Sequence, residues 1–375
     1  MKKIFLLSTL CLLAIMSSCR DDNDNDIIGS NNSNVTEGSD QELSGFYLLN
    51  EGQWGANNST LDYFDVKTGI YSSNIYAERN PNVIKELGDT GNDLKIYNGR
   101  LYAVMNGSHK VEIMTADSAK HIAEVDIPNG RFICFDGNYA YVSSYVGASR
   151  GNGEVLGAVY KLDTQTATVV DSVLVGYQPE ELAVVDSTLY VANSGGLHTG
   201  YDNTVSVIDL DHFTVTGEIT VGINPFRVKA DNKGHLYVSS QGNYFDIPAN
   251  LYVIDTQSNH VVDTLNIGAS ELCIVGDTAY AYSSEWSNTT NAYTYTYHTI
   301  DLNTREVSPA TFVTDGTPIA SLYGMAVNPH TKEVYLTDAG GDYTNSGTIF
   351  CFNPDGTLKW KADTGVSPAH FALKY

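Results

Sequence analysis

The sequence has few cysteines and no long hydrophobic run. Five cysteines occur in 375 residues, and none of them belongs to a CxxC or CxxCH motif. This argues against a zinc ribbon, a thioredoxin-type redox pair and a c-type haem. Cys134, Cys273 and Cys351 lie far apart in apolar stretches, so we expect buried free thiols. The longest apolar segment, Ile4 to Met16, is short for a bilayer span.

Basic residues and catalytic motifs are scarce as well. The chain has 21 Lys and Arg against 44 Asp and Glu, which gives a formal net charge of −23. A field of that sign repels nucleic acid and anionic lipid headgroups, so we expect neither as a partner. The nine histidines show no HxH or HExxH spacing, and the chain contains no GxSxG elbow and no phosphate-binding loop. We therefore expect a protein without catalytic residues, a catalytic zinc or a cofactor.

The first residues form a targeting segment. Lys2 and Lys3 precede the apolar segment, and Ser17, Ser18 and Cys19 follow it, as in a secretory signal. The small residues before the cysteine resemble the lipobox of bacterial lipoproteins. That resemblance implies a signal peptide over residues 1–18 and a lipid on Cys19. An ordinary signal peptide with an incidental cysteine is the alternative.

Residues 19–44 are rich in Asp, Asn, Ser and Gly and have almost nothing to bury, so we expect a flexible tether. Its acidic cluster resembles the export signal of lipoproteins displayed on the outer face of a Gram-negative outer membrane; the cluster is Asp21, Asp22, Asp24 and Asp26. The location implied is the cell surface, with the membrane contacted through the lipid only. A solvated linker on a periplasmic protein is the alternative.

Beyond the tether the chain is a repeat. Residues 179–224 contain four β-branched, aromatic-rich runs separated by turns, and residues 225–270 repeat them after 46 positions. The Asp that closes the third run recurs at the same interval; the four positions are Asp163, Asp209, Asp255 and Asp301. Four strands at this period are typical of a β-propeller, in which stacked units bury the faces that one unit leaves open.

We predict an all-β, seven-bladed propeller of four-stranded antiparallel blades over residues 45–375. About seven units fit the length, but the first supplies only three strands, beginning with Gly45-Phe46-Tyr47. The last segment, from Pro368 to Tyr375, matches the first strand of a unit and nothing more. Pairing these two segments closes the ring and removes an open sheet edge.

Two resemblances follow from particular residues. The strands YVSS, YVAN and YLTD and the Gly-x-x-Pro before several units resemble the YVTN-repeat, YncE-like propellers, which supports the fold. The opening NEGQWGANNSTLDYFD, together with the lipobox and the acidic tether, is similar to surface lipoproteins of gut bacteria that include the cobalamin-binding BtuG subgroup. That resemblance implies capture of cobalamin (vitamin B12) and delivery to a TonB-dependent outer-membrane transporter. It assigns no individual contact residue.

The loops between second and third strands are long, whereas the turns between third and fourth strands have about four residues. Since these loops share a face with the connections between blades, we expect that face to bind a ligand. The long loops are Gly52 to Ser59, Tyr145 to Gly157, Ser194 to Asn203, Gln241 to Asn250, Glu285 to Ala292 and Ala339 to Gly347. Their candidate ligand-binding residues are Trp54, Tyr145, Arg150, His198, Tyr201, Asp202, Tyr244, Phe245, Asp246, Trp286 and Tyr343. At the mouth of the axial channel the candidates are Arg131, Tyr177, Phe226, Arg227 and Tyr323. The same connections between blades also offer Gln178, Glu180, Glu271 and His370, and some of these residues could simply satisfy backbone groups between blades.

Flat aromatics among amides and carboxylates suit a large, partly apolar ligand such as a corrinoid or a sugar chain. Several of these rings could equally pack beneath their own loops. A glycan- or peptide-binding lipoprotein, a propeller enzyme of the lactonase or quinoprotein type, and a structural surface-layer role stay open as alternatives. A structural calcium ion on Asp338, Asp342 and Asn345 is a further alternative, although the EF-hand order of ligands is missing. We expect the free protein to be a monomer.

Overall fold

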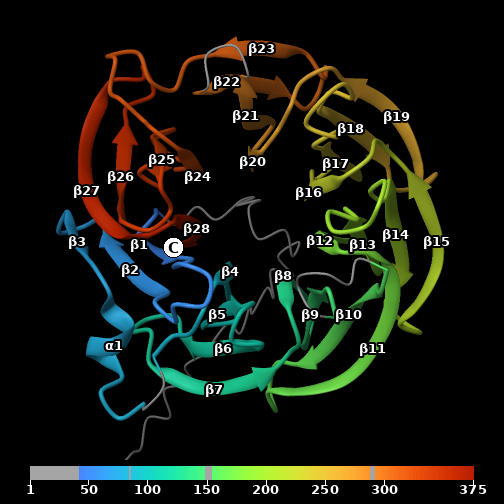
Figure 1. Ribbon diagram of the computed structural model, residues 1–375, viewed down its shortest axis with the longest axis horizontal. Helices are drawn as coiled ribbons and strands as arrows, with labels where there is room; N and C mark the ends of the chain where they lie inside the picture. The colour runs from blue at the N-terminus through green and yellow to red at the C-terminus, as the bar shows by residue number, and fades with distance from the viewer. Residues whose placement is uncertain (1–41, 84–85, 148–153, 288–291) are drawn as a thin grey trace, which may run out of the picture.

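The protein is a seven-bladed β-propeller. In the computed structural model, which describes residues 42–83, 86–147, 154–287 and 292–375, seven sheets stand around a central axis (Figure 1). Each sheet has four antiparallel strands. This confirms the predicted fold and blade number. Within the described residues no helix has the length and apolar character needed to cross a membrane.

The blades are numbered here in chain order. Blade 1 contains β28 (Pro368–Lys374), β1 (Gly45–Asn50), β2 (Thr60–Asp65) and β3 (Ile70–Ser72). Blade 2 contains β4 (Gly91–Tyr97), β5 (Arg100–Met105), β6 (Lys110–Thr115) and β7 (His121–Asp126). Blade 3 contains β8 (Gly130–Asp136), β9 (Tyr139–Ser144), β10 (Leu156–Asp163) and β11 (Thr168–Tyr177). Blade 4 contains β12 (Pro179–Val185), β13 (Thr188–Asn193), β14 (Thr204–Asp209) and β15 (Thr214–Thr220).

The remaining blades follow the same order from the axis outward. Blade 5 contains β16 (Pro225–Ala230), β17 (His235–Ser240), β18 (Asn250–Asp255) and β19 (His260–Leu265). Blade 6 contains β20 (Glu271–Val275), β21 (Thr278–Ser287), β22 (Ala292–Asp301) and β23 (Val307–Ala310). Blade 7 contains β24 (Leu322–Val327), β25 (Val334–Asp338), β26 (Ser346–Phe352) and β27 (Leu358–Val366). A short helix, α1 (Ile75–Arg79), lies between blades 1 and 2 and was not expected from the sequence.

The ring closes as predicted, with the last strand completing the first blade. β28 pairs antiparallel with β1, from Gly45 opposite Lys374 to Leu48 opposite Phe371 and beyond. The Ser44 N–H donates to the Lys374 carbonyl at 2.8 Å, which brings the two ends of the domain together. β28 is the innermost strand of its blade (Figure 1).

The repeated tyrosine of the second strands packs between blades. Tyr102, Tyr141, Tyr190 and Tyr237 are all fully buried, which accounts for the ring at this position of the repeat. The Tyr190 hydroxyl donates to Asn259 Oδ1 at 2.9 Å, in a turn of the next blade. Large buried rings thus join each sheet to its neighbour, whereas the hydroxyls of Tyr102 and Tyr237 are buried without a hydrogen-bond partner among the described residues.

The recurring strand-end aspartate closes the turn to the outer strand. Asp163 Oδ1 accepts the N–H groups of Gln165 and Thr166, and Asp301 Oδ1 accepts the Asn303 N–H at 2.8 Å. These backbone hydrogen bonds lower the pKa of both carboxyls. The aspartate forms an Asx turn at the same place in successive units, which is the physical reason why it recurs every 46 residues.

The Gly-x-x-Pro motif marks the passage from one blade to the next. A Cβ on Gly176 would lie 2.5 Å from the Asn193 side chain, so only glycine fits there. Gln178, before Pro179, has a φ of 41°, in the left-handed region. The motif therefore encodes a close approach of the backbone followed by a sharp turn into the innermost strand.

The long loops and the connections between blades share one face, as predicted. The Tyr145 N–H donates to the Asn129 carbonyl, and the Gln241 N–H donates to Asn224 in the same way at 2.9 Å. One expected loop is shorter than predicted. The pairing of β21 with β22 extends as far as Ser287 opposite Ala292, so Trp286 belongs to a strand and pairs with Tyr293. The run of Ser, Asn and Thr in this segment suggested a loop, but long-range pairing extended the hairpin.

Candidate functional site

The innermost strands bring chemically distinct residues to the axis. When the seven strands are aligned by their pairing with the second strands, one equivalent position forms what we call the middle ring. Its members are Asp93, Phe132, Glu181, Arg227, Glu271, Gly324 and His370. The neighbouring position toward the long-loop face forms the upper ring. Its members are Asn92, Arg131, Glu180, Phe226, Ser270, Tyr323 and Ala369.

Irregular pairing at the top of these strands is compensated by side chains. The register shifts before Ile133 and before Val228, which frees backbone N–H groups. The Ile133 N–H donates to Asp93 at 3.0 Å, and the Val228 N–H donates to Glu181 at 3.0 Å. Because each carboxylate serves the next blade, the middle ring also fixes the blades to one another.

A cavity of about 440 Å³, which we call the funnel, opens at the upper ring. Its wall combines aromatic rings with arginine, amide and hydroxyl groups from six of the seven blades. The principal lining residues are Glu51, Asn92, Arg131, Phe132, Phe226, Arg227, Gln241, Tyr282, Tyr293, Tyr323, Tyr343 and His370. A cavity of this size with convergent polar groups is typical of a small-molecule site.

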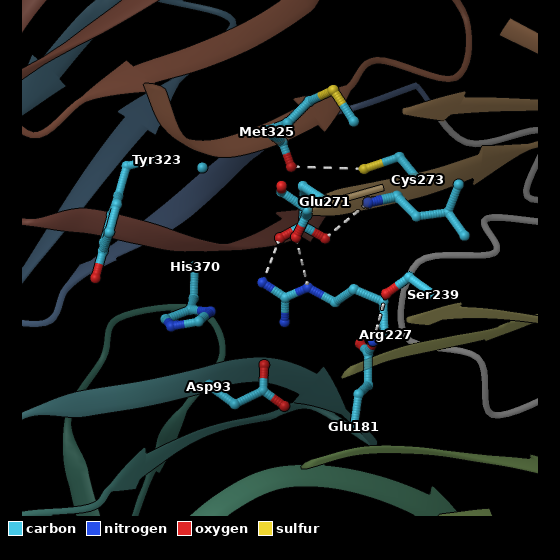
Figure 2. Close-up of polar contacts among 12 residues, drawn as sticks. Asp93, Glu181, Arg227, Ser239, Glu271, Cys273, Tyr323, Met325 and His370 are labelled. Atoms are coloured by element: carbon cyan, nitrogen blue, oxygen red, sulfur yellow. Dashed lines mark hydrogen bonds and ion pairs between the residues drawn. The ribbon is translucent and has the colours of Figure 1, made fainter. Parts of the chain in front are cut away.

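A second cavity, also of about 440 Å³, continues along the axis below the funnel, and we call it the lower chamber. Phe132, Arg227 and His370 line both cavities, so they form the floor of the funnel. The rings of Phe132 and His370 meet edge to face with their centroids 6.4 Å apart, and the Arg227 guanidinium lies 5.2 Å from the Phe132 ring centre. Figure 2 shows Arg227 extending across the channel toward the side of His370.

The charged groups along the axis form close pairs. Arg227 Nη2 lies 2.7 Å from Glu271 Oε2, and Lys95 Nζ lies 3.1 Å from Asp93 Oδ1 (the first pair is dashed in Figure 2). Burial is the largest single influence and raises the pKa of the Asp93 carboxyl, but the charges of Lys95 and His370 and the Ile133 N–H together lower the pKa below its usual value. Burial likewise opposes protonation of Lys95, and the charges of Asp93, Glu181 and Glu271 together raise its pKa above the usual value. Both groups therefore stay ionised, and removing one partner would leave an uncompensated buried charge.

Glu51 organises one side of the funnel. Its Oε2 accepts the Tyr323 hydroxyl at 2.5 Å, and its Oε1 lies 3.0 Å from His370 Nε2. Burial and the adjacent Glu51 charge raise the pKa of Tyr323 well above the usual value, so this phenol stays protonated and donates. The Tyr323 ring also meets Tyr343 edge to face, at 5.7 Å between centroids.

Six of the residues predicted from sequence line the funnel: Arg131, Phe226, Arg227, Tyr323, Tyr343 and His370. Arg131 is held by Glu180, with Nη2 2.9 Å from Oε2. Phe226 lies beneath the Arg227 guanidinium at 4.5 Å. The predicted mouth of the channel is therefore the region where these candidates gather.

Other candidates pack within their own part of the face. Tyr145 donates to Glu180 and lies 4.9 Å under the Arg131 guanidinium. Tyr177 stacks on His198 at 4.2 Å between centroids, and His198 Nε2 lies 3.5 Å from Glu154. These rings support the wall rather than line the funnel.

Two candidate carboxylates are engaged by their loops. Asp202 accepts the Tyr177 N–H at 2.9 Å and the Thr204 hydroxyl at 2.8 Å. Asp246 accepts the Asn243 amide at 2.6 Å. Both carboxylates therefore shape the loops of blades 4 and 5.

Aromatic side chains stand exposed at the rim. Phe245 is 89% exposed and Tyr244 is 71% exposed, with the Tyr244 hydroxyl contacting Gln241 of the funnel wall. Trp54 is 46% exposed, across the face in blade 1. Tyr201, in the loop of blade 4, is partly buried and has a positive φ of 64°.

Several candidates lie outside what the structure describes. Arg150, Cys19 and the predicted tether up to residue 41 are outside the described residues, and so is the side chain of Trp286, whose backbone is in β21. At the end of the predicted tether, Leu43 is buried in the core, so the ordered domain begins slightly earlier than expected. The proposed calcium ligands make backbone contacts instead: Asp338 accepts three N–H groups, and Asp342 accepts those of Thr344 and Asn345. Across the described residues, no group of three or more His, Cys, Asp and Glu is arranged to hold a metal ion. Cys134, Cys273 and Cys351 are buried and free, as predicted.

Sequence reasoning missed Phe132, Glu51, Tyr282 and Tyr293 as funnel residues. Phe132 holds the same position of its innermost strand as Arg227 and His370. Aligning the first strands of the seven units would have found it without a structure. Glu51, Tyr282 and Tyr293 follow from no such rule, because their side chains reach the funnel from second and third strands or their loops.

Comparisons with solved structures support the fold. One similar structure is a hypothetical selenium-binding protein from Sulfolobus tokodaii, with a TM-score of 0.65 and 12% identity, covering 89% of this chain and 94% of that one. Another is a quinonprotein alcohol dehydrogenase-like protein from Bacteroides thetaiotaomicron, with a TM-score of 0.61 and 13% identity over 88% of this chain and 78% of that one. A third is the periplasmic gluconolactonase of Pseudomonas aeruginosa, with a TM-score of 0.58 and 12% identity over 88% and 99% of the two chains. At these identities the likeness concerns the fold alone.

The sequence comparisons place the chain in a family without assigning an activity. No curated protein matches it. A family model described as a domain of unknown function matches residues 44–363, nearly the whole propeller. The chain therefore belongs to this family, DUF5074.

Proposed function

We propose that this protein captures a small-molecule ligand in the funnel, most specifically cobalamin, without converting it. The observation that carries the proposal is the funnel itself, a cavity of about 440 Å³ whose wall combines rings, arginines and amides from several blades. A ligand held by several blades gains many modest contacts on a rigid platform and loses little entropy in reorganising it.

A corrinoid is larger than the funnel, so part of it would lie across the mouth. The exposed rings of Trp54, Tyr244 and Phe245 stand on that face and offer flat apolar surface to such a ligand. The similarity of the opening blade and tether to cobalamin-binding surface lipoproteins supports the same ligand.

The proposal includes a location and a recipient. The lipobox cysteine, Cys19, and the acidic residues behind it support a lipid anchor on the outer face of an outer membrane. A protein anchored there would pass its ligand to a TonB-dependent transporter in the same membrane. The free protein would act as a monomer.

Gel filtration after equilibration with cyanocobalamin tests the ligand. We expect the visible absorbance of cyanocobalamin to elute with the protein. The Phe226→Ala variant should retain less of it, whereas the Gln257→Ala variant, changed in a turn on the opposite face, should retain as much as the unaltered protein. Elution of all the cyanocobalamin in the small-molecule volume would end the cobalamin proposal, and a glycan array would then test the closest alternative.

A further inference from the structure

Two polar atoms at the funnel floor have no hydrogen-bond partner among the residues that the structure describes. Arg227 donates through Nε to the Ser270 carbonyl at 3.4 Å and through Nη2 to Glu271 at 2.7 Å. His370 uses Nε2 toward Glu51. Within the described part of the chain, no hydrogen bond engages Nη1 of Arg227 or Nδ1 of His370.

These two atoms face open space. The side chains of Arg227 and His370 are largely buried, with exposures of 10% and 11%. The two atoms themselves are nevertheless not among the fully buried polar atoms that lack a partner, so they keep some accessible surface. Because Arg227 and His370 line both axial cavities, the atoms are accessible from the hollow of the channel. The guanidinium lies 5.2 Å and the imidazole 6.4 Å from the centre of the Phe132 ring, and Figure 2 shows the Arg227 side chain directed toward the side of His370.

The hydrogen-bonding character of each atom follows from its surroundings. Nη1 of an arginine carries two N–H groups and can only donate. A carboxylate can only accept, so the contact with Glu51 places the proton of a neutral His370 on Nε2. Nδ1 of His370 is then an acceptor.

The funnel floor therefore offers a donor and an acceptor, both carried by groups that lie against the Phe132 ring. A primary carboxamide matches both, since its carbonyl accepts from Arg227 and its NH₂ group donates to His370. A carboxylate matches only one, and its second oxygen would face the lone pair of Nδ1. The Glu51 carboxylate, which contacts His370 itself, disfavours an added negative charge beside it as well.

We propose that the funnel floor is a subsite for a primary carboxamide of the ligand, held between Arg227 Nη1 and His370 Nδ1. The inference deepens the proposed function, on which it rests for the location of the ligand. It fits cobalamin, whose corrin ring carries primary amide side chains at its edge. The subsite itself discriminates by chemistry and would select amides over the corresponding acids in any ligand that reaches it.

Nicotinamide and nicotinate provide a matched pair of probes, because they are similar in size and differ in carrying a carboxamide or a carboxylate on the same ring. With the full-length protein at pH 7, titrations followed by NMR should show nicotinamide binding about tenfold more tightly than nicotinate, the effect of one unsatisfied buried polar contact. The Arg227→Met/Glu271→Gln variant removes both charges of the buried ion pair and should bind both probes weakly. The His370→Phe variant keeps a ring and should bring the two affinities close to one another.

Two further variants separate recognition from folding. Lys233→Met/Asp277→Asn removes another ion pair linking blades 5 and 6, far from the funnel lining, and should leave the preference unchanged. Arg227→Lys keeps a cation beside Glu271 and serves if the double variant fails to fold; it should still lose the preference. Equal binding of the two probes to the unaltered protein, or a preference that persists in folded Arg227 and His370 variants, would overturn the subsite.

The outcome is distinguishable from failure of the proposed function. If cyanocobalamin is not retained but nicotinamide binds with the predicted dependence on Arg227 and His370, the subsite stands and cobalamin capture falls. If cyanocobalamin is retained with unchanged affinity by the folded Arg227 and His370 variants, the subsite falls and capture stands.

Discussion

Deleting the final strand, residues 368–375, should unfold the propeller. β28 makes six registered pairs with β1, and the side chains of Phe46 and Leu48 in β1 are fully buried beside Phe371. Six backbone hydrogen bonds at about 1 kcal/mol each, together with the exposure of two or three large apolar side chains at about 2 kcal/mol each, amount to roughly 10 kcal/mol. That loss is comparable with the whole stability of a domain, about 5–15 kcal/mol.

Thermal unfolding and gel filtration would measure the effect, and the truncated chain should aggregate or show no cooperative transition. A circular permutant is the matched control. Ser44 contacts Lys374 at 2.8 Å through its N–H, so residues 368–375 can be placed directly before Ser44. The permutant should unfold near the temperature of the unaltered protein. A truncated chain that stayed monomeric with an unchanged melting temperature would refute the closure argument.

Three other predictions concern binding, pH and location. Trp54→Ala and Phe245→Ala should each weaken cyanocobalamin binding about tenfold, because aromatic anchors dominate such sites. Both rings are exposed, so the melting temperature should not change. Variants that bind cyanocobalamin as tightly as the unaltered protein would assign the ligand to another surface. The folded pKa of Asp93 is depressed, so its contribution to stability is present above the unfolded pKa of about 3.9 and is lost as the pH falls through the folded value. Acid unfolding of Asp93→Asn should therefore depend less steeply on pH, and an identical pH profile would contradict that pairing. Cys19→Ser should release the protein in soluble form. A protease added to whole cells should cleave the unaltered protein, and an uncleaved protein would contradict a surface location.

Much of the fold could be predicted because it depends on local rules that repeat. The strand-end Asp163, the Gly176-x-x-Pro179 passage and the buried Tyr190 each perform one local task, and repetition at a fixed interval makes them visible in the sequence. The incomplete first unit and the surplus strand at residues 368–374 determined both the blade count and the closure.

The candidate site was predicted only in part, because it is made where seven strands converge. Loop length indicated the face on which the funnel opens, but it directed attention to rings such as Phe245 at the rim, whereas Phe132 at the floor comes from an inner strand. The extended pairing of Trp286 likewise depended on a partner strand and not on its own turn-forming neighbours.

The sequence by itself determined the repeat, the number of blades, the strand that closes the ring and the face that carries the long loops. The tertiary structure decided which side chains meet at the axis, how Glu51, Arg227 and Glu271 pair there, and which atoms they leave open to a ligand. The physical reason is that turns and strand alternation depend on neighbours in the chain, whereas the contact between Glu51 and His370 joins residues 319 positions apart, and only closure of the ring brings them together.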